Sequence, residues 1–178
     1  LRAAGHDTRL VNLNENLPPT PTRDDVYELV RDWQPGLIGF SCLTMQYEAA
    51  VKIATFLRTA ARSGGLELPP LVVGGIHPTM VPDEVMRDNV WDYVGMGECE
   101  NALLELVTRV EAGERPDDVP NFLAWKGGLR PIFERGRALE ESDYVRTPVG
   151  EFPDLVNLPE PHYELFDVER ITDHKQGW

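Results

Sequence analysis

Small and polar residues follow three short apolar runs of the sequence, and their types favour binding of a ligand rather than catalysis. The first group is Ser41-Cys42-Leu43-Thr44, directly after the apolar run 37–40. Hydroxyl groups at this position could hydrogen-bond a ligand without filling the space that it needs. Capping of the following helix by Ser41 or Thr44 is the alternative interpretation. We expect all four residues to line a ligand site.

The second group is Gly74-Gly75-Ile76-His77-Pro78-Thr79, after the apolar run 71–73. Two glycines directly after a buried strand indicate either close approach of the backbone to a ligand or unusual turn dihedrals. A plain turn is the alternative. His77 could hydrogen-bond a ligand or bind a metal, or it could be an ordinary loop residue. We expect Gly74, Gly75 and His77 to contact the ligand.

The third group is Gly95-Met96-Gly97-Glu98-Cys99-Glu100, which opens a helix. Free N–H groups at the start of a helix favour anionic groups such as phosphate, although Glu98 and Glu100 could cap the helix instead. The spacing differs from a nicotinamide fingerprint, because Glu100 replaces the third glycine and the segment follows the last strand. We expect Gly95, Met96, Gly97 and Glu98 to contact the ligand. No catalytic triad or pair of acid and base carboxylates stands out.

The elements that must position these groups alternate between strands and helices. This order predicts an α/β fold of the flavodoxin or Rossmann type, a parallel sheet with helices on both faces. Right-handed crossovers then place the three groups at one edge of the sheet, where such folds bind ligands. The predicted strands are residues 9–14, 37–40, 71–73 and 91–94, and the predicted helices are residues 22–33, 46–62, 82–88 and 102–113.

The two ends of the sequence differ from this pattern. Residues 1–5 are typical of the last turn of a helix, with Gly5 ending it, so we expect a piece of a longer polypeptide without its first strand. A small β-hairpin is expected from 122–125 and 131–133, followed by an extended linker. The predicted domains are therefore an α/β domain at 1–115, a hairpin extension at 116–147 and a linker at 148–178.

Composition excludes several classes of partner. The 178 residues carry a formal net charge of −13, which argues against a nucleic acid or an anionic membrane surface. No run approaches the roughly 20 apolar residues of a membrane span. The two cysteines, Cys42 and Cys99, favour a reducing cytoplasm over a disulfide scaffold, and ordinary packing over a metal site.

The residue pattern of the first two groups resembles that of a known family. The pattern has Ser41 and Leu43 after one predicted strand and Gly74-Gly75 after the next. It is similar to the pattern of the corrinoid-binding domain shared by methionine synthase and the coenzyme-B12 mutases. The resemblance implies that Ser41 and Leu43 line the pocket for the cobalamin nucleotide tail and that the glycines give it room. A third hydroxyl residue of that motif would fall at Met45, and Thr44 is the neighbouring candidate for its role.

A narrower resemblance is carried by the segments 73–79, 82–84, 92–94, 97–100 and 158–167. It covers most of the chain and is to cobalamin-dependent radical S-adenosylmethionine proteins, among them methyltransferases and ring-forming cyclases. It implies cobalamin as cofactor here, with S-adenosylmethionine and a 4Fe-4S cluster in a radical SAM catalytic domain of the same polypeptide, beyond Trp178. The Cys-x-x-x-Cys-x-x-Cys cluster motif of that domain does not occur in this sequence.

Two points stay open at this stage. Neither His6 nor His77 is assigned as an axial cobalt ligand, because the family loop that supplies one follows a strand that this sequence does not contain. The alternative function is a degenerate regulatory or interaction domain of the same fold, which binds no cobalamin, or a flavin or another small ligand instead.

Overall fold

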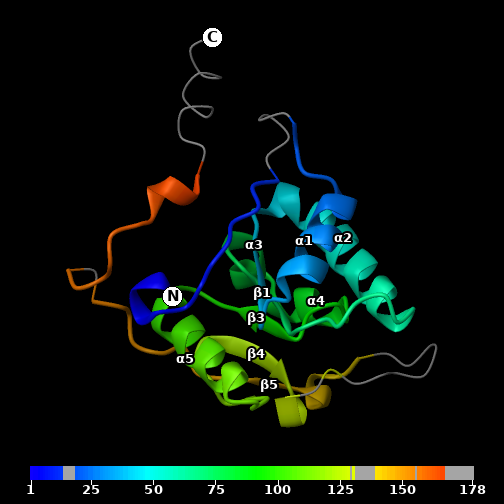
Figure 1. Cartoon of the computed structure of the whole chain (residues 1–178). Coiled ribbons are helices and arrows are strands. Elements are labelled where there is room, and N and C mark those ends of the chain that lie inside the picture. The colour runs from blue at the N-terminus through cyan, green and yellow to red at the C-terminus, as the bar shows by residue number, and fades with distance from the viewer. Residues whose placement is uncertain (14–18, 129, 131–138, 155, 167–178) are drawn as a thin grey trace. The chain divides into compact units, whose positions relative to one another are not determined.

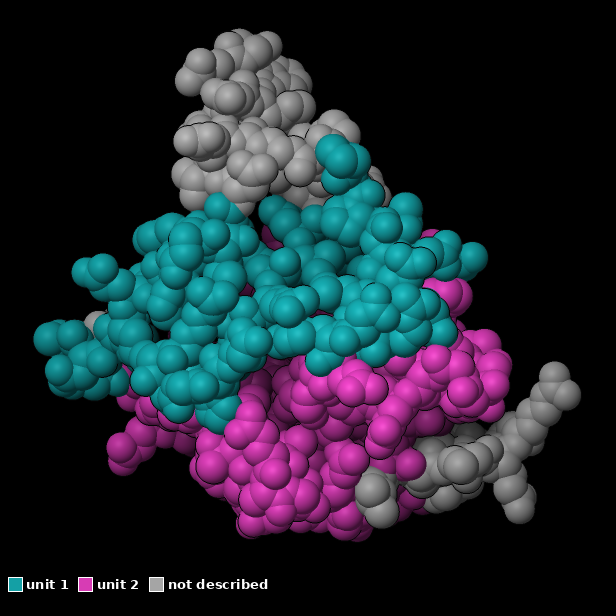
Figure 2. All heavy atoms as spheres, in the orientation of Figure 1, with its two compact units in different colours: residues 1–33, 154–178 teal, residues 34–153 magenta. Residues whose placement is uncertain are grey.

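The computed structural model describes residues 1–13, 19–128, 130, 139–154 and 156–166 (Figure 1). The chain divides into two compact units, one of residues 1–33 with 154–178 and the other of residues 34–153 (Figure 2). None of the helices in the described ranges is long and apolar enough to span a membrane. The three groups of candidate residues all belong to the second unit.

The first unit contains two of the predicted helical features. A 3-10 turn at Arg2–Ala4 ends at Gly5, whose φ of 91° is left-handed, as expected for a helix end. Helix α1 covers Arg23–Trp33. Thr22 and Asp25 cap it reciprocally, since each side chain accepts a hydrogen bond from the backbone N–H of the other. A further 3-10 turn covers Tyr163–Leu165.

The prediction of a strand at residues 9–14 is wrong for residues 9–13, the part of it that the structure describes. Residues 9–13 are irregular, and Asn14 lies outside the described residues. A strand needs a neighbouring strand to accept and donate its backbone hydrogen bonds. The described part of the chain pairs no strand with this run, so its alternating side chains alone do not create one.

The second unit is built on a five-stranded sheet in the order β1-β2-β3-β4-β5. The first three strands are parallel and the last two are antiparallel, so the predicted α/β fold is confirmed with a mixed sheet. The hairpin partner of β4 lies later than the predicted segment 131–133, which is outside the described residues. The strands are Ile38–Ser41 (β1), Leu71–Gly74 (β2), Tyr93–Gly95 (β3), Phe122–Trp125 (β4) and Tyr144–Arg146 (β5).

Helices cover both faces of this sheet (Figure 1). Alternate side chains of a strand point to opposite faces. Leu71 and Val73 of β2 belong to an apolar cluster with residues of α2 and α4, whereas Val72 belongs to a second cluster with residues of α5. The helices are Thr44–Arg62 (α2), Ile76–Met80 (α3), Pro82–Arg87 (α4) and Glu100–Glu111 (α5), and 3-10 turns cover Lys126–Gly128 and Glu141–Asp143.

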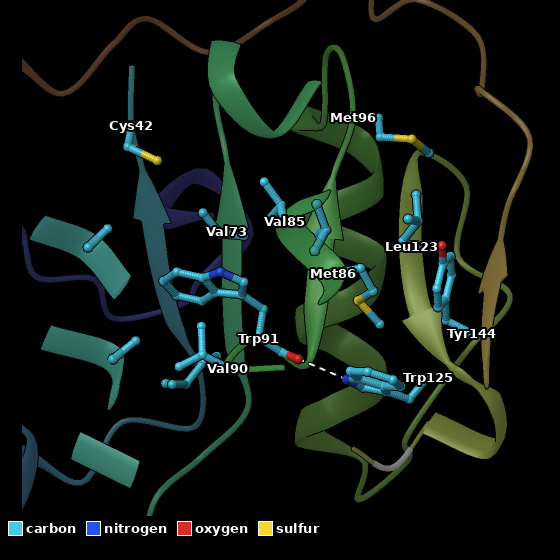
Figure 3. Packing of buried hydrophobic residues seen from close by; sticks show 14 residues of the cluster. Cys42, Val73, Val85, Met86, Val90, Trp91, Met96, Leu123, Trp125 and Tyr144 are labelled. Carbon is cyan, nitrogen blue, oxygen red and sulfur yellow. Dashed lines mark hydrogen bonds between the residues drawn. The ribbon is translucent and has the colours of Figure 1, made fainter. Parts of the chain in front are cut away.

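Two features of the unit differ from the expectation. The continuously apolar run 37–40 is typical of a strand buried on both faces. Gly39 and Ser41 of β1 are nevertheless exposed, because β1 is the edge strand of the described sheet. Strands β4 and β5 extend the same sheet and share its core, so the expected boundary after residue 115 falls inside one compact unit. Figure 3 shows this shared core, in which the indole N–H of Trp125 donates to the Trp91 carbonyl oxygen at 2.8 Å.

Candidate ligand-binding site

The three groups of candidate residues meet at one edge of the sheet. Ser41 at the end of β1 is in register with Gly74 at the end of β2, and Val73 is in register with Val94 of β3. Figure 3 shows Cys42 and Met96, which follow β1 and β3, at the same end of the core. Parallel strands joined by right-handed crossovers produce this convergence.

Backbone hydrogen bonds join the first two groups into one surface. The Cys42 N–H donates to the Gly74 carbonyl oxygen at 3.1 Å, and the His77 N–H donates to the Cys42 carbonyl oxygen at 3.4 Å. Cys42 is buried beneath this junction. It can therefore face a ligand only through its backbone, whereas its neighbours Ser41 and Leu43 are exposed.

The two adjacent glycines have different roles. Gly75 has a φ of 99° and a ψ of −168°, a conformation that is essentially restricted to glycine. A Cβ atom there would lie 2.8 Å from the Cys42 carbonyl oxygen. At Gly74 a Cβ atom would meet nothing within 4 Å. Packing of the two loops therefore requires Gly75, and Gly74 is the one that leaves open space.

The hydroxyl groups of the first loop are not used as helix caps. Helix α2 begins at Thr44 after the N-cap residue Leu43, and the Leu43 N–H donates to the Gln46 side-chain oxygen at 3.0 Å. Within the described part of the chain the exposed Ser41 hydroxyl has no hydrogen-bond partner. The capping alternative is therefore wrong for Ser41 and Thr44, and both hydroxyls can reach a ligand.

His77 is held at this edge by an aromatic side chain that sequence reasoning missed. Its ring stacks on Tyr47 with centroids 4.3 Å apart, and its Nδ1 lies 3.4 Å from the Thr44 hydroxyl oxygen. The Tyr47 hydroxyl donates to Asp88 and accepts from the Trp91 indole at 3.1 Å. Burial raises the pKa of Tyr47 well above its usual value, so the phenol keeps its proton.

The third group is only partly exposed. Gly95 and Met96 are buried, with Met96 6% exposed, and a Cβ at Gly95 would meet the Cys99 sulfur at 3.2 Å. Gly97 and Glu98 are exposed. Helix α5 begins after the N-cap residue Cys99 without a side-chain cap, so Glu98 does not cap it. Gly97 and Glu98 are thus the residues of this group that a ligand can reach.

Thr79 connects the second and third groups, and sequence reasoning did not select it as a site residue. Its hydroxyl donates to the Gly75 carbonyl oxygen at 2.8 Å and accepts from the Gly97 N–H at 3.0 Å. Thr79 lies on α3, a short helix in a stretch that was expected to be a loop. The signal in the sequence was a hydroxyl residue four positions after Gly75, one helical turn away.

Exposed apolar side chains occur in the segments that follow β1 and β2. Met45 is 85% exposed and Met80 73% exposed, and Leu43 and Ile76 are also exposed. Burial raises the pKa of the Cys42 and Cys99 thiols to about 11. Among the described residues no group of His, Cys, Asp and Glu side chains is suited to a metal ion.

Comparison with known proteins finds one family model and several solved structures that are similar to this chain. A family model described as a B12 binding domain matches residues 1–107. The solved structure of the cobalamin-dependent S-adenosylmethionine radical enzyme OxsB, with aqua-cobalamin and S-adenosylmethionine bound, is similar with a TM-score of 0.65 and 18% identity. No curated protein matches this chain.

A second solved structure has the same fold. It is the radical S-adenosylmethionine methyltransferase TsrM from Kitasatospora setae, with cobalamin and a [4Fe-4S] cluster bound, at a TM-score of 0.51 and 20% identity. The similarity covers 86% of this chain and 19% of OxsB, and 78% of this chain and 24% of TsrM. The chain therefore spans about a fifth to a quarter of the length of these proteins.

Proposed function

This chain belongs to the B12-binding domain family, and on that premise we propose that the open side of Gly74 receives the nucleotide tail of cobalamin. The single observation that carries this proposal is the contrast between the two glycines. At Gly75 the neighbouring loop occupies the space that a Cβ atom would need. At Gly74 no described atom lies within 4 Å of the position that a Cβ atom would take. Hydrogen bonds hold together the two loops that follow β1 and β2, so the position of Gly74 is fixed.

The residues around Gly74 fit the chemistry of this cofactor. The unpartnered Ser41 hydroxyl and the nearby Thr44 hydroxyl can hydrogen-bond the polar tail, and His77 is oriented by Tyr47 at the same edge. The exposed Leu43 offers an apolar contact to the nucleotide tail. Gly97 and Glu98 line the far side of the site, and Gly95 and Met96 support them from within. Bound cobalt supplies the methyl or electron chemistry, and the chain binds and orients the cofactor.

We further propose that this domain serves a larger radical S-adenosylmethionine enzyme, a methyltransferase or a ring-forming cyclase. The fold shared with OxsB and TsrM supports this proposal. Residues 148–178 would lead to the catalytic domain, which would hold S-adenosylmethionine and the 4Fe-4S cluster. The two free cysteines and the net charge of −13 support a cytoplasmic protein without a nucleic-acid partner.

The alternative of a degenerate domain that binds no cobalamin is not favoured. Loss of the ligand would be expected to leave bulky side chains in the site, since an empty space costs packing energy. Gly74 instead keeps its open side, and the residues nearest to it at the strand ends are small.

Titration of the chain with hydroxocobalamin, followed by the shift of its visible absorption bands, tests this assignment. We expect micromolar binding by the native chain and a loss of about tenfold or more in Gly74→Trp, which fills the open space. Gly36→Trp is the matched control, because Gly36 is exposed and its Cβ position is equally open. Gly36 precedes β1 and therefore lies at the amino ends of the parallel strands, away from the candidate site. Unchanged binding in Gly74→Trp, or equal losses in both variants, would refute the proposed location.

A further inference from the structure

The third loop of the site is held by a residue outside the part of the chain that matches the B12-binding family. The Met96 N–H donates to the backbone carbonyl oxygen of Asn121 at 2.7 Å. The Asn121 side-chain amide donates to the Glu98 carbonyl oxygen at 2.5 Å. Asn121 therefore contacts the loop on both sides of Gly97, although the family match ends at residue 107.

Asn121 is a buried polar residue in an unusual conformation. It is 5% exposed and has a φ of 64°, a left-handed value that asparagine tolerates better than most residues. Its side-chain oxygen accepts from the Gly150 N–H at 2.5 Å, and its own N–H donates to the Pro148 carbonyl oxygen at 3.0 Å. Each of its polar groups thus has a partner.

The identity of this residue follows from these contacts. Glycine would adopt the same backbone conformation but would lose both side-chain hydrogen bonds. Aspartate would keep an acceptor for Gly150, but a carboxylate oxygen would then face the Glu98 carbonyl oxygen, which also only accepts. Asparagine supplies a donor for one neighbour and an acceptor for the other at a left-handed position.

We propose that Asn121 is a positioning residue for cobalamin binding, which fixes the shape of the loop carrying Gly97 and Glu98. This inference rests on the proposed location of the cofactor. It makes strand β4 and the segment around Gly150 part of the binding apparatus, beyond the residues that the family match includes. Thr79 holds the Gly97 N–H from the other side, so the loop is fixed between α3 and the start of β4.

The test compares Asn121→Asp and Asn121→Gly with the native chain by hydroxocobalamin titration and by amide hydrogen exchange. At neutral pH we expect Asn121→Asp to weaken binding by about tenfold or more and to speed exchange at Met96 and Gly97. Protonation restores a donor to the introduced carboxyl, so its affinity should recover as the pH falls from about 7 to about 5. The native chain should show no such recovery, and Asn121→Gly should bind weakly at both pH values.

A control separates positioning from general stability. Leu57→Ala removes a fully buried side chain of α2 and destabilises the fold, yet it should bind cobalamin like the native chain. Native-like binding by both Asn121 variants, a pH-independent affinity of Asn121→Asp, or an equal loss in Leu57→Ala would overturn the inference. A native chain that does not bind hydroxocobalamin refutes the proposed function instead, and faster exchange at Met96 and Gly97 still reports whether Asn121 holds the loop.

Discussion

Replacement of Gly75 with alanine should destabilise the fold far more than the same change at Gly74. The backbone at Gly75, with φ 99° and ψ −168°, costs a residue with a Cβ about 1–3 kcal/mol. The added atom would also lie 2.8 Å from the carbonyl oxygen and 3.0 Å from the nitrogen of Cys42. No Cβ occupies such positions without movement of the neighbouring backbone.

That movement would weaken the hydrogen bonds that join the two loops. The Cys42 N–H bonds to Gly74 and the His77 N–H bonds to Cys42, and each such bond contributes about 0.5–1.5 kcal/mol. At Gly74 a Cβ meets nothing within 4 Å and φ is not left-handed, so alanine there should change stability by no more than about 0.5 kcal/mol. The backbone conformation of Gly75→Ala alone should lower the melting temperature by about 2–12 °C.

Urea unfolding followed by tryptophan fluorescence is the suitable assay, because Trp91 and Trp125 are fully buried in the same unit as Gly75. We expect the unfolding midpoint of Gly75→Ala to fall clearly below that of Gly74→Ala, with a similar slope. Equal midpoints for the two variants would refute the argument that loop packing requires Gly75 and that the Gly74 side is open.

Two further predictions concern the same unit. Thr79→Val removes the hydroxyl that bridges Gly75 and Gly97 and should lower the free energy of urea unfolding by about 0.5–1.5 kcal/mol per hydrogen bond. Thr79→Ser keeps the hydroxyl and should unfold at nearly the native urea midpoint. Equal losses of stability in the two variants would contradict a role for the hydroxyl. Burial raises the pKa of Cys42 and Cys99 from 9.0 to about 11 and that of Tyr93 from 10.0 to about 12. These groups lose their protons first in the unfolded chain, so their contribution to stability is complete below pH 9.0 and is lost as the pH rises towards these raised values. Urea midpoints at about pH 8 and about pH 10.5 check this, and a midpoint that rises with pH would contradict it.

Much of the fold could be predicted from the sequence because its signals are local. Two of these signals are the continuous apolar run 71–73, which predicts a buried strand, and the helical stripe of small and apolar residues in 46–62, which predicts a helix. The structure has the expected elements there, β2 and α2. The cap formed by Thr22 and Asp25 is a local signal of the same kind, since Thr-x-x-Asp at 22–25 marks a helix start in the sequence.

The sequence by itself also determined which residues gather at the candidate site. Parallel strands with right-handed connections bring their carboxyl ends together whatever the details of packing. Ser41, Gly74 and Gly97 could therefore be chosen as neighbours before any coordinates were known. Two adjacent glycines look alike in a sequence, however, and nothing local distinguishes a glycine that a neighbouring loop requires from one beside open space.

Only the tertiary structure decided the contacts that shape the site. The side chains of Tyr47 and Trp91 meet across 44 positions of the sequence, and Asn121 reaches Glu98 across 23. The partner of β4 proved to be Tyr144–Arg146, and residues 9–13 found no strand partner among the described residues. Hydrogen bonds between distant segments depend on where folding brings the backbone, and residue order alone does not contain that position.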